Sequence, residues 1–314
     1  MKREFSRLAV APEILVFRKD VPLVSVGIPT YNRPEGLRRT LECIVGQTYS
    51  NLEIIVSDNG STDPRVAIVA GQFQVRDSRI RYVRQPVNLG PTENFRFVLH
   101  EAIGDYFMWA ADDDGWESEF IERLAALLED DPETGVAFCD FDARDPRGHR
   151  VDTYPDFLPL LQSYAGKPVA RRLAAYIAQE ESLGKANLVY GLYRRRLLVS
   201  VGGIRAWGIG WWGADMLIAC SVLAKANVAI EPRLLYHVGT APQVGDASRP
   251  ETPMHSEARA WRLVKAIGRH VGYMLGYARI IVGVPRMGFA DRAALLWIVV
   301  RRLAAFVWKD LTSA

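Results

Sequence analysis

The sequence predicts an α/β protein in which a mainly parallel, Rossmann-like sheet is flanked by helices and followed by a C-terminal helical tail. Apolar runs of strand length alternate with helix-period segments up to residue 141, and polar residues follow each of the first four runs. Apolar groups then recur at helical spacing in residues 255–309. Parallel strands need long crossovers, usually helices, so the alternation favours parallel pairing with helices on both faces.

Residues 21–141 read as strands and helices in turn. Each expected strand is a short run rich in β-branched or aromatic residues, and each expected helix repeats apolar residues three or four positions apart. The strands are predicted at 23–28, 52–57, 80–83, 106–110 and 136–141. The helices between them are predicted at 35–45, 65–75, 92–103 and 117–128.

The periodicity weakens beyond residue 142. Prolines and glycines in residues 143–166 predict a variable loop. The later elements are expected as a helix at 170–178, a strand at 187–193, a helix at 214–224, strands at 228–230 and 234–238, a loop at 240–253, and helices at 255–284 and 287–309. The chain therefore divides into a lead-in (1–20), two halves of one domain (21–142 and 143–253) and a tail (254–314).

Composition is that of an ordinary globular protein, with 49% hydrophobic and 24% charged residues. The odd number of cysteines (Cys43, Cys139 and Cys220) argues against a disulfide framework and for a reducing compartment. No stretch without Asp, Glu, Lys or Arg is longer than 21–32, which is too short to span a bilayer, and no secretory signal is evident. We expect a cytoplasmic protein, with the inner face of the plasma membrane as a further location.

Three adjacent acids, Asp112, Asp113 and Asp114, follow the buried run 106–111. Neighbouring carboxylates repel one another and are costly to keep charged at a strand end, and a cation would remove that cost. Oxygen ligands of this kind suit Mn²⁺ or Mg²⁺ ions that also hold a diphosphate. The alternative is a solvated acidic turn in which an Asp caps the following helix.

Polar segments also follow the first three strands, at 29–33, 58–63 and 88–91. Ligands of parallel sheets sit at the carboxyl ends of the strands. Four polar strand ends at one edge therefore predict a ligand-binding crevice.

These segments resemble the motifs of the family 2 glycosyltransferases, which have the GT-A fold. The resemblance rests on Val-Ser-Val-Gly-Ile-Pro-Thr-Tyr-Asn-Arg (24–33), Glu-Ile-Ile-Val-Ser-Asp-Asn-Gly-Ser-Thr-Asp (53–63), Asn-Leu-Gly (88–90) and the acid triplet. It is clear over residues 22–140, looser to about 240, and absent from the tail. It implies a metal-dependent, inverting enzyme that moves a sugar from a nucleoside diphosphate, with a UDP-sugar favoured, to an acceptor hydroxyl.

The same resemblance assigns the donor nucleotide to the first half of the domain and the acceptor to the second. Asp58 would accept the uracil N3–H, although an Asx-turn is its alternative. Arg33 would meet phosphate, although it is equally well explained as a solvated side chain, and Asn94 would face the ribose or diphosphate. The full set of expected donor residues is Pro29, Thr30, Tyr31, Arg33, Asp58, Asn88, Gly90, Asn94, Asp112 and Asp113.

The acid triplet corresponds to the family's metal-binding DXD element. Asp112 and Asp114 fit its spacing literally, whereas alignment on Trp116 makes Asp113 the main ligand. We expect one Asp to touch the ribose and Asp113 and Asp114 to bind the metal. His237 resembles a late histidine that completes the metal site in some members, but a lone histidine at a strand end is as often structural.

The segment Trp211-Trp212-Gly213-Ala214-Asp215-Met216 resembles the family's ED element, which supplies the catalytic base. Ala214 stands at the Glu position, so Asp215 is the sole candidate, with a helix N-cap as its alternative. Trp211 and Trp212 are expected to form a platform for the acceptor sugar, and core packing is the alternative for either.

Two other functions remain as alternatives. A sugar nucleotidyltransferase would usually carry a glycine-rich, basic loop after the first strand, which 28–33 is not. A non-catalytic nucleotide-sugar-binding protein is the second alternative, because Ala214 departs from the family pattern. Analogy favours bacterial surface polysaccharide or lipid-linked glycan assembly, hence a glycan or lipid-linked acceptor.

The tail is strongly basic. From residue 259 onward ten Lys and Arg residues are opposed only by Asp291 and Asp310, so this part carries +8 and the remainder −5. A helix that is basic on one face and apolar on the other can lie on an anionic membrane. The alternatives are packing on its own domain or on a second subunit in a homodimer, and nucleic-acid binding is not expected because no recognition motif is present.

Overall fold

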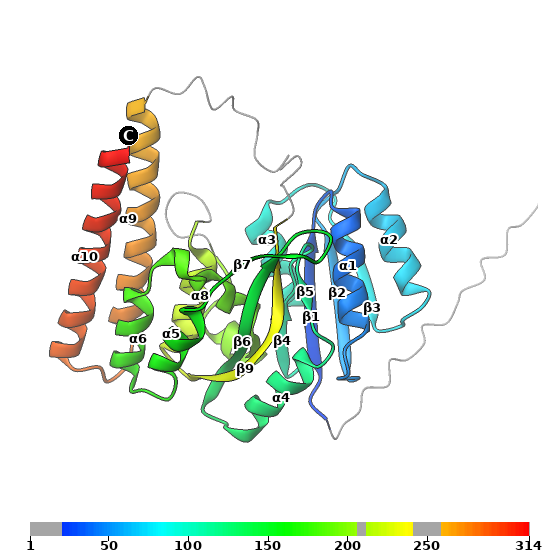
Figure 1. Cartoon of the computed structure of the whole chain (residues 1–314), viewed down its shortest axis with the longest axis horizontal. Coiled ribbons are helices and arrows are strands. Elements are labelled where there is room, and N and C mark those ends of the chain that lie inside the picture. Colours follow the sequence, from blue (N-terminus) through cyan, green and yellow to red (C-terminus); the bar gives the residue numbers. More distant parts are fainter. Residues whose placement is uncertain (1–20, 206–211, 241–258, 314) are drawn as a thin grey trace, which may run out of the picture.

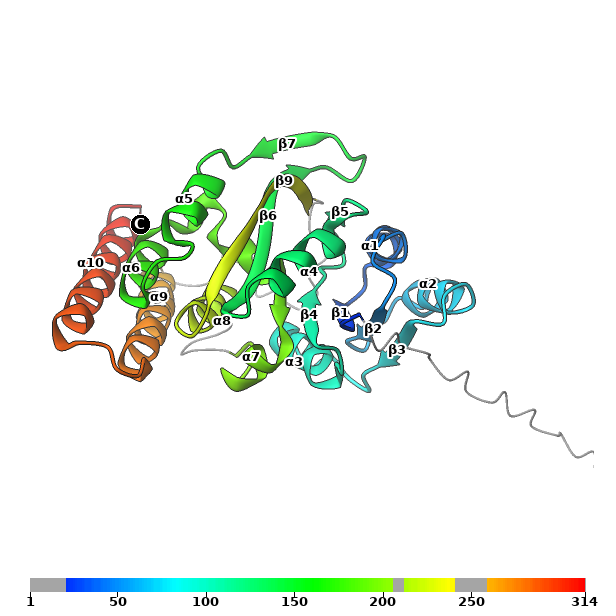
Figure 2. The same ribbon diagram turned by 90° about the horizontal axis from the view of Figure 1, so that it is seen from below.

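A computed structural model describes residues 21–205, 212–240 and 259–313, and it confirms the α/β fold class (Figure 1). In these residues the strands form a nine-stranded sheet in the order β3-β2-β1-β4-β8-β6-β9-β5, with β7 paired to β6. Helices cover both faces of the sheet (Figure 2).

The first half follows the predicted strand and helix alternation. Its four strands pair in parallel, and every residue of β1 and β2 is buried, which explains their nearly continuous apolar sequences. The strands are β1 (Val24–Thr30), β2 (Leu52–Asp58), β3 (Ile80–Arg84) and β4 (Tyr106–Trp109). The helices that follow the first three strands are α1 (Pro34–Val45), α2 (Arg65–Gln74) and α3 (Pro91–Glu101).

The sheet of the second half is mixed. β6 and β9 are parallel, whereas β8 lies antiparallel between β4 and β6, and β5 and β7 are antiparallel additions. The strands are β5 (Gly115–Trp116), β6 (Thr134–Arg144), β7 (Arg150–Thr153), β8 (Leu192–Arg194) and β9 (Asn227–Gly239). α4 (Phe120–Asp130) is the last helix of the first half, and the helices of the second half are α5 (Phe157–Tyr164), α6 (Val169–Ala178), α7 (Arg195–Ser200) and α8 (Ala214–Leu223).

Three sequence expectations for this half were wrong. The segment 143–166 is not a loop: it forms β7 and α5, and Pro159 sits in the first turn of α5, where proline is tolerated. The predicted strand 187–193 is mostly the short 3-10 helix η2 (Lys185–Tyr190), which follows a similar turn, η1 (Glu181–Leu183). The two strands expected at 228–238 are one strand, β9, whose pairing with β6 shifts register midway.

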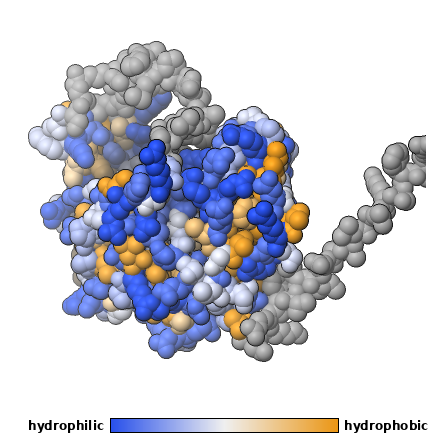
Figure 3. All heavy atoms as spheres, turned by 45° about the vertical axis from the view of Figure 1, so that its right-hand side comes forward, coloured by the Kyte–Doolittle hydropathy of each residue, from blue (hydrophilic) through white to orange (hydrophobic). Residues whose placement is uncertain are grey.

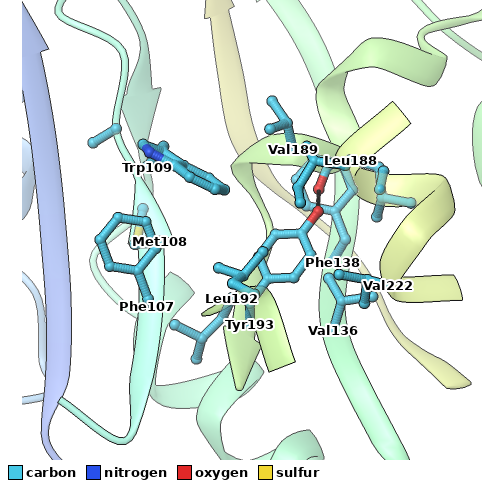
Figure 4. Close-up of a cluster of buried hydrophobic side chains, with 14 of the residues drawn as sticks. Phe107, Met108, Trp109, Val136, Phe138, Leu188, Val189, Leu192, Tyr193 and Val222 are labelled. Carbon is cyan, nitrogen blue, oxygen red and sulfur yellow. Dashed lines mark hydrogen bonds between the residues drawn. The ribbon is translucent and has the colours of Figure 1, made fainter. Parts of the chain in front are cut away.

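The two halves share one hydrophobic core. Aromatic side chains of β4, including Phe107 and Trp109, lie opposite Phe138 of β6 and Tyr193 of β8 (Figure 4). The Tyr193 hydroxyl donates a hydrogen bond of 2.6 Å to the Leu188 carbonyl, so η2 is fastened beneath this cluster. A continuous core keeps the strand ends of both halves in a fixed relation.

The tail forms a helical hairpin of α9 (Arg259–Gly283) and α10 (Phe289–Ser313). The hairpin packs on α6 and α8 at the end of the molecule opposite α2 (Figures 1 and 2). Its inner face is the buried set Tyr273, Met274, Tyr277, Ile281, Leu295 and Val299. The inner face of the hairpin therefore packs on its own domain. No described helix is both long and apolar enough to cross a bilayer.

The junction between the hairpin and the domain yields a stability prediction. Gly213, at the N-cap of α8, has φ +79°, and a Cβ there would lie 2.5 Å from a ring atom of Tyr273. Gly166 has φ +66° but open space around it. We expect Gly166→Ala to lower the free energy of unfolding by about 1–2 kcal/mol, the cost of positive φ alone, and Gly213→Ala to add about 1–3 kcal/mol for the clash. Urea unfolding measures both, and equal losses would contradict this packing of α9.

Candidate functional site

The first polar loop and the acid triplet meet at the carboxyl edge of the sheet. The Thr30 hydroxyl donates a 2.7 Å hydrogen bond to Asp112. One guanidinium nitrogen of Arg33, Nη1, lies 3.2 Å from Asp112 and 2.6 Å from Asp113. The parallel register that places Thr30 beside Asp58 brings the second loop to the same edge.

The first two acids converge on Arg33, and the third points toward β9. Asp112 faces Thr30 and Arg33, whereas Asp114 accepts hydrogen bonds from the Tyr236 hydroxyl and, at 2.8 Å, from the Gly239 amide. Both side chains are buried, and their burial, followed by the charge of Asp113, raises their pKa values. Asp113 is the most accessible of the three, with 21% of its side chain exposed.

The arrangement of the three carboxylates limits the kind of metal site that they can form. Within residues 21–205, 212–240 and 259–313, no three His, Cys, Asp or Glu side chains are arranged to hold an ion by themselves. Asp112 and Asp113 nevertheless already share one cation, the guanidinium of Arg33. Asp113, the more exposed of the two, fits a hard ion bound through one or two carboxylates, with substrate phosphates supplying other ligands.

His237 is engaged elsewhere in this structure. Its Nδ1 lies 2.6 Å from Asp142 and its Nε2 lies 2.9 Å from Glu117. Both ring nitrogens therefore already have carboxylate partners. In the β5–β9 pair His237 stands opposite Gly115, the residue that directly follows Asp114.

Asp58 lies where the second loop begins. One carboxylate oxygen accepts the Ser61 amide at 2.8 Å, which is the Asx-turn alternative, and the other accepts the Tyr82 hydroxyl at 2.7 Å. Each oxygen keeps a second lone pair. Asp58 is thus a buried turn-former that retains acceptor capacity toward a base N–H.

Two asparagines that the sequence analysis missed join the loops. Asn32, with φ +55°, accepts the amides of Thr62 and Asp63 and so ties the loop carrying Tyr31 to the second loop. Asn59 donates to the Asn88 side chain at 2.8 Å and accepts the Leu89 amide at 2.8 Å, which ties the second loop to the third. Their positions in Tyr-Asn-Arg and Asp-Asn-Gly were the available signal, because Asn readily forms such local turns.

The remaining expected donor residues divide into exposed and buried ones. Gly90 has φ +84°, and a Cβ placed on it would meet no atom within 4 Å, so the backbone there is approachable. Tyr31 is partly exposed, whereas Pro29 is buried inside β1. Asn94 is buried, donates to the Ser57 carbonyl at 3.0 Å and accepts the Ser57 hydroxyl at 2.6 Å, so it ties α3 to β2.

Asp215 is the second residue of α8, and the N-cap is Gly213, so the N-cap alternative for Asp215 was wrong. Burial raises its pKa to about 6, although the Met216 amide, 2.8 Å from its carboxylate, opposes the shift. Burial, followed by the charges of Asp114, Asp113 and Asp215, raises the pKa of Tyr190, whose ring centroid lies 5.7 Å from that of Tyr236. The charges of Asp215 and of the triplet therefore affect the pKa of the same side chain.

Trp212 packs against the tail. Its ring lies edge-on to Tyr273, with centroids 4.9 Å apart, and to His270, at 5.1 Å. This is the packing alternative for that residue. Trp211 lies outside the described residues.

A buried lysine beneath Asp215 is a further residue that the sequence analysis missed. Lys185 donates to the Gln179 carbonyl at 3.2 Å and lies 4.7 Å from the ring centroid of Tyr176. Burial lowers its pKa to about 7. Tyr176 in turn donates to the Met216 carbonyl at 3.0 Å, so this group supports the start of α8. No local sequence pattern marks it, because its surroundings are assembled from separate elements.

A cavity of about 260 Å³ opens beside the triplet. Asp113, Asp114 and His237 line one side. The β6–β7 turn with Arg144 and Asp145 contributes to its wall. Its lining combines these charged side chains with apolar surface, to which Cys43, Trp116 and Pro146 contribute.

Comparisons with known proteins identify the family of the chain. A family model described as Glycosyl transferase family 2 matches residues 25–185. The chain is 37% identical over 120 residues to abequosyltransferase RfbV of Salmonella typhimurium, covering 38% of the chain and 35% of that protein. It is 24% identical over 263 residues to the O-antigen biosynthesis protein RfbC of Myxococcus xanthus, covering 82% of the chain and 19% of that protein.

A third relative, an uncharacterized glycosyltransferase of Haemophilus influenzae, is 29% identical over 147 residues, which is 46% of the chain and 58% of that protein. The chain thus spans between 19% and 58% of the length of these three relatives. Among solved structures, S. aureus TarS 1-349 in complex with UDP-GlcNAc has a TM-score of 0.63 at 17% identity, covering 90% of this chain and 73% of that one. Mannosyltransferase PcManGT from Pyrobaculum calidifontis, with GDP-Man and Mn²⁺, has a TM-score of 0.52 at 18% identity, covering 98% and 79%.

The buried position of Asn94 generates a prediction. Asn94→Ala removes the partner of the Ser57 hydroxyl and carbonyl, and leaving such buried groups unpaired costs about 1–3 kcal/mol. The adjacent Glu93 makes an exposed ion pair with Arg96, so Glu93→Ala should change the free energy of unfolding by less than about 0.5 kcal/mol. Denaturant unfolding compares the two. An Asn94→Ala protein as stable as wild type that loses donor affinity would instead give Asn94 a direct ligand contact.

Proposed function

Because the chain belongs to glycosyl transferase family 2, we propose that it transfers a sugar from a nucleoside diphosphate, with UDP as the favoured nucleotide, to an acceptor hydroxyl. The observation that carries the proposal is the position of Arg33 between Asp112 and Asp113 at the carboxyl edge of the sheet. A cationic fork and two carboxylates at one point suit a diphosphate together with its counter-ion. The nucleotide sugars held by TarS and PcManGT support the same substrate class.

The donor is held by the three loops that follow β1, β2 and β3. Tyr31 stacks on the base, Thr30 orients it, and Asp58 accepts its N–H with the lone pairs left over from Ser61 and Tyr82. The open backbone at Gly90 and the side chain of Asn88 lie along the nucleotide. Arg33 leaves the acids and pairs with phosphate oxygens when the donor binds.

The metal ligands proposed are Asp113 first and Asp114 second, for Mn²⁺ or Mg²⁺, with Asp112 turned toward the ribose. When bound, the ion would supply positive charge to the departing diphosphate. His237 would join only by exchanging its Glu117 bond for the ion. The Mn²⁺ of PcManGT supports a metal in this family, and the accessible carboxylate of Asp113 supports its place here.

Asp215 is the proposed base. At neutral pH a carboxylate with a pKa of about 6 is ionised, yet it is basic enough to take the proton of an acceptor hydroxyl. That hydroxyl then attacks the anomeric carbon opposite the leaving group, which inverts its configuration. The acceptor proposed is a glycan or a lipid-linked glycan of a surface polysaccharide, supported by the names of RfbV and RfbC. The nucleotidyltransferase alternative has no support among the matches described.

Replacement of the base should separate chemistry from binding. Asp215→Asn keeps the shape of the side chain and removes its basicity, so turnover should fall about 10²–10⁴-fold while calorimetry finds nearly unchanged UDP affinity. For wild type, kcat/KM should rise with pH through about 6, as the base loses its proton. The surface change Asp291→Asn is the control. If UDP affinity fell as much as turnover, Asp215 would belong to the nucleotide site.

Removal of Arg33 should strengthen metal binding when no donor is present. Arg33→Gln frees Asp112 and Asp113 from a competing cation, and because a partly exposed ion pair contributes about 1 kcal/mol, Mn²⁺ affinity should rise roughly three- to tenfold. Arg38→Gln, on the outer side of α1, should leave it unchanged, and Asp113→Asn should weaken it. Electron paramagnetic resonance of free Mn²⁺ measures all three. Equal Mn²⁺ affinity in wild type and Asp113→Asn would refute the proposed ligand.

A further inference from the structure

The outer face of the α9–α10 hairpin carries most of the large apolar side chains that the described residues leave exposed. Phe289 is 89% exposed, Trp297 62% and Trp308 71%. The remaining members on the two helices are Val264, Leu275, Val282, Val300 and Leu311. α10 is the outermost element of this end of the molecule in both ribbon views (Figures 1 and 2).

These side chains of α10 form a continuous stripe. Phe289, Val300 and Leu311 are eleven residues apart, which is close to three helical turns, so they lie on one line along the helix. Trp297 and Trp308 have the same spacing and lie on the neighbouring line. The stripe runs along the whole helix, on the side away from the buried residues Leu295 and Val299.

Positive charge surrounds the stripe. Arg301 lies within it, and Arg286 lies in the turn that precedes α10; both are exposed. The exposed residues Lys265, Arg269 and Arg279 of α9 add to this charge. The acids of the hairpin are Asp291 and Asp310, and the Asp310 carboxylate faces His270 at 3.0 Å. The outer surface is therefore apolar, aromatic and cationic together.

This combination distinguishes between occupants. A second copy meeting the same face across a two-fold axis would bring Arg286 and Arg301 against equally cationic surface. An anionic lipid surface complements that charge, and tryptophans favour the boundary between headgroups and acyl chains. Figure 3 shows a mixture of hydrophilic and apolar side chains on the α2 side of the molecule, where the exposed apolar residues, such as Ile68 and Val75, are aliphatic and not aromatic.

We propose that the outer face of α10 docks in the plane of an anionic lipid bilayer, with Trp297 and Trp308 at the headgroup boundary and Arg286 and Arg301 on lipid phosphates. The docking is peripheral, in keeping with the lack of a described helix that could span a bilayer. The inner face of the same hairpin contacts Gly213 through Tyr273, two residues from Asp215. The docked surface and the start of α8 are thus separated by the hairpin alone. The inference stands independently of the proposed reaction.

Flotation of the full chain with vesicles tests the proposal. Wild type should float with vesicles of phosphatidylcholine and phosphatidylglycerol at low salt, float less at high salt, and stay unbound with phosphatidylcholine alone. Brominated lipid should quench its tryptophan fluorescence. Binding that is absent from the anionic vesicles, or equal on neutral ones, overturns the proposal.

Paired variants separate the two components. Trp297→Ser with Trp308→Ser should lower partitioning at least tenfold and remove the quenching. Arg286→Gln with Arg301→Gln should lower partitioning about 25-fold, since each cation near an anionic surface contributes about fivefold. Val75→Ser with Arg76→Gln is the matched control: both residues are exposed at the end of α2, and this variant should bind like wild type.

Sedimentation velocity tests whether a second copy of the chain, and not a membrane, covers the stripe. A second copy would cover the stripe if wild type formed concentration-dependent dimers and did not bind the anionic vesicles. The tryptophan variant would then be monomeric. Control and tryptophan variants that bind equally would also overturn the proposal. Circular dichroism of each variant should match wild type, because every substituted side chain is exposed.

Discussion

The structure depends on how it accommodates three adjacent carboxylates at the end of a buried strand. Two of them are nearly inaccessible, and each is stabilised by a different part of the chain: Asp112 by the first loop, and Asp114 by β9 through Tyr236 and Gly239. Repulsion between neighbours is relieved because Arg33 neutralises Asp112 and Asp113, whereas Asp114 turns away toward β9. Asp112 contacts the first loop and Asp114 contacts β9, so the triplet joins both halves of the domain at one point. The electrostatic constraint therefore also builds the site.

Arg33 allows the acids to change their cationic partner. Its guanidinium bridges the two acids nearest the first loop, and the residue is itself about one-third exposed, so a change of partner does not require the core to open. An exchange of arginine for a metal ion would keep the acids neutralised throughout, while the arginine becomes available for phosphate. Asp114, locked by two hydrogen bonds, would keep its position during that exchange.

Much of the first half could be predicted from the sequence. Its strands are short, uninterrupted apolar runs separated by crossover helices, so the polar strand ends, and with them Thr30, Arg33 and the triplet, had to meet at one edge. The second half resisted prediction for specific reasons. Pro159 obscured the helical repeat of Phe157, Leu161 and Tyr164. Trp212 appeared free to stack on a sugar because its partners, His270 and Tyr273, come from the distant tail.

The central claim is that the acids and Arg33 form a metal and diphosphate site in which the cations exchange partners. A crystal structure with UDP and Mn²⁺, with anomalous scattering to locate the ion, tests it most directly. The account predicts an anomalous peak within coordination distance of Asp113 and of the diphosphate, with the Arg33 guanidinium moved from the acids to a phosphate oxygen. An ion bound away from the triplet, or an Arg33–Asp113 pair that stays intact beside bound UDP, would contradict it.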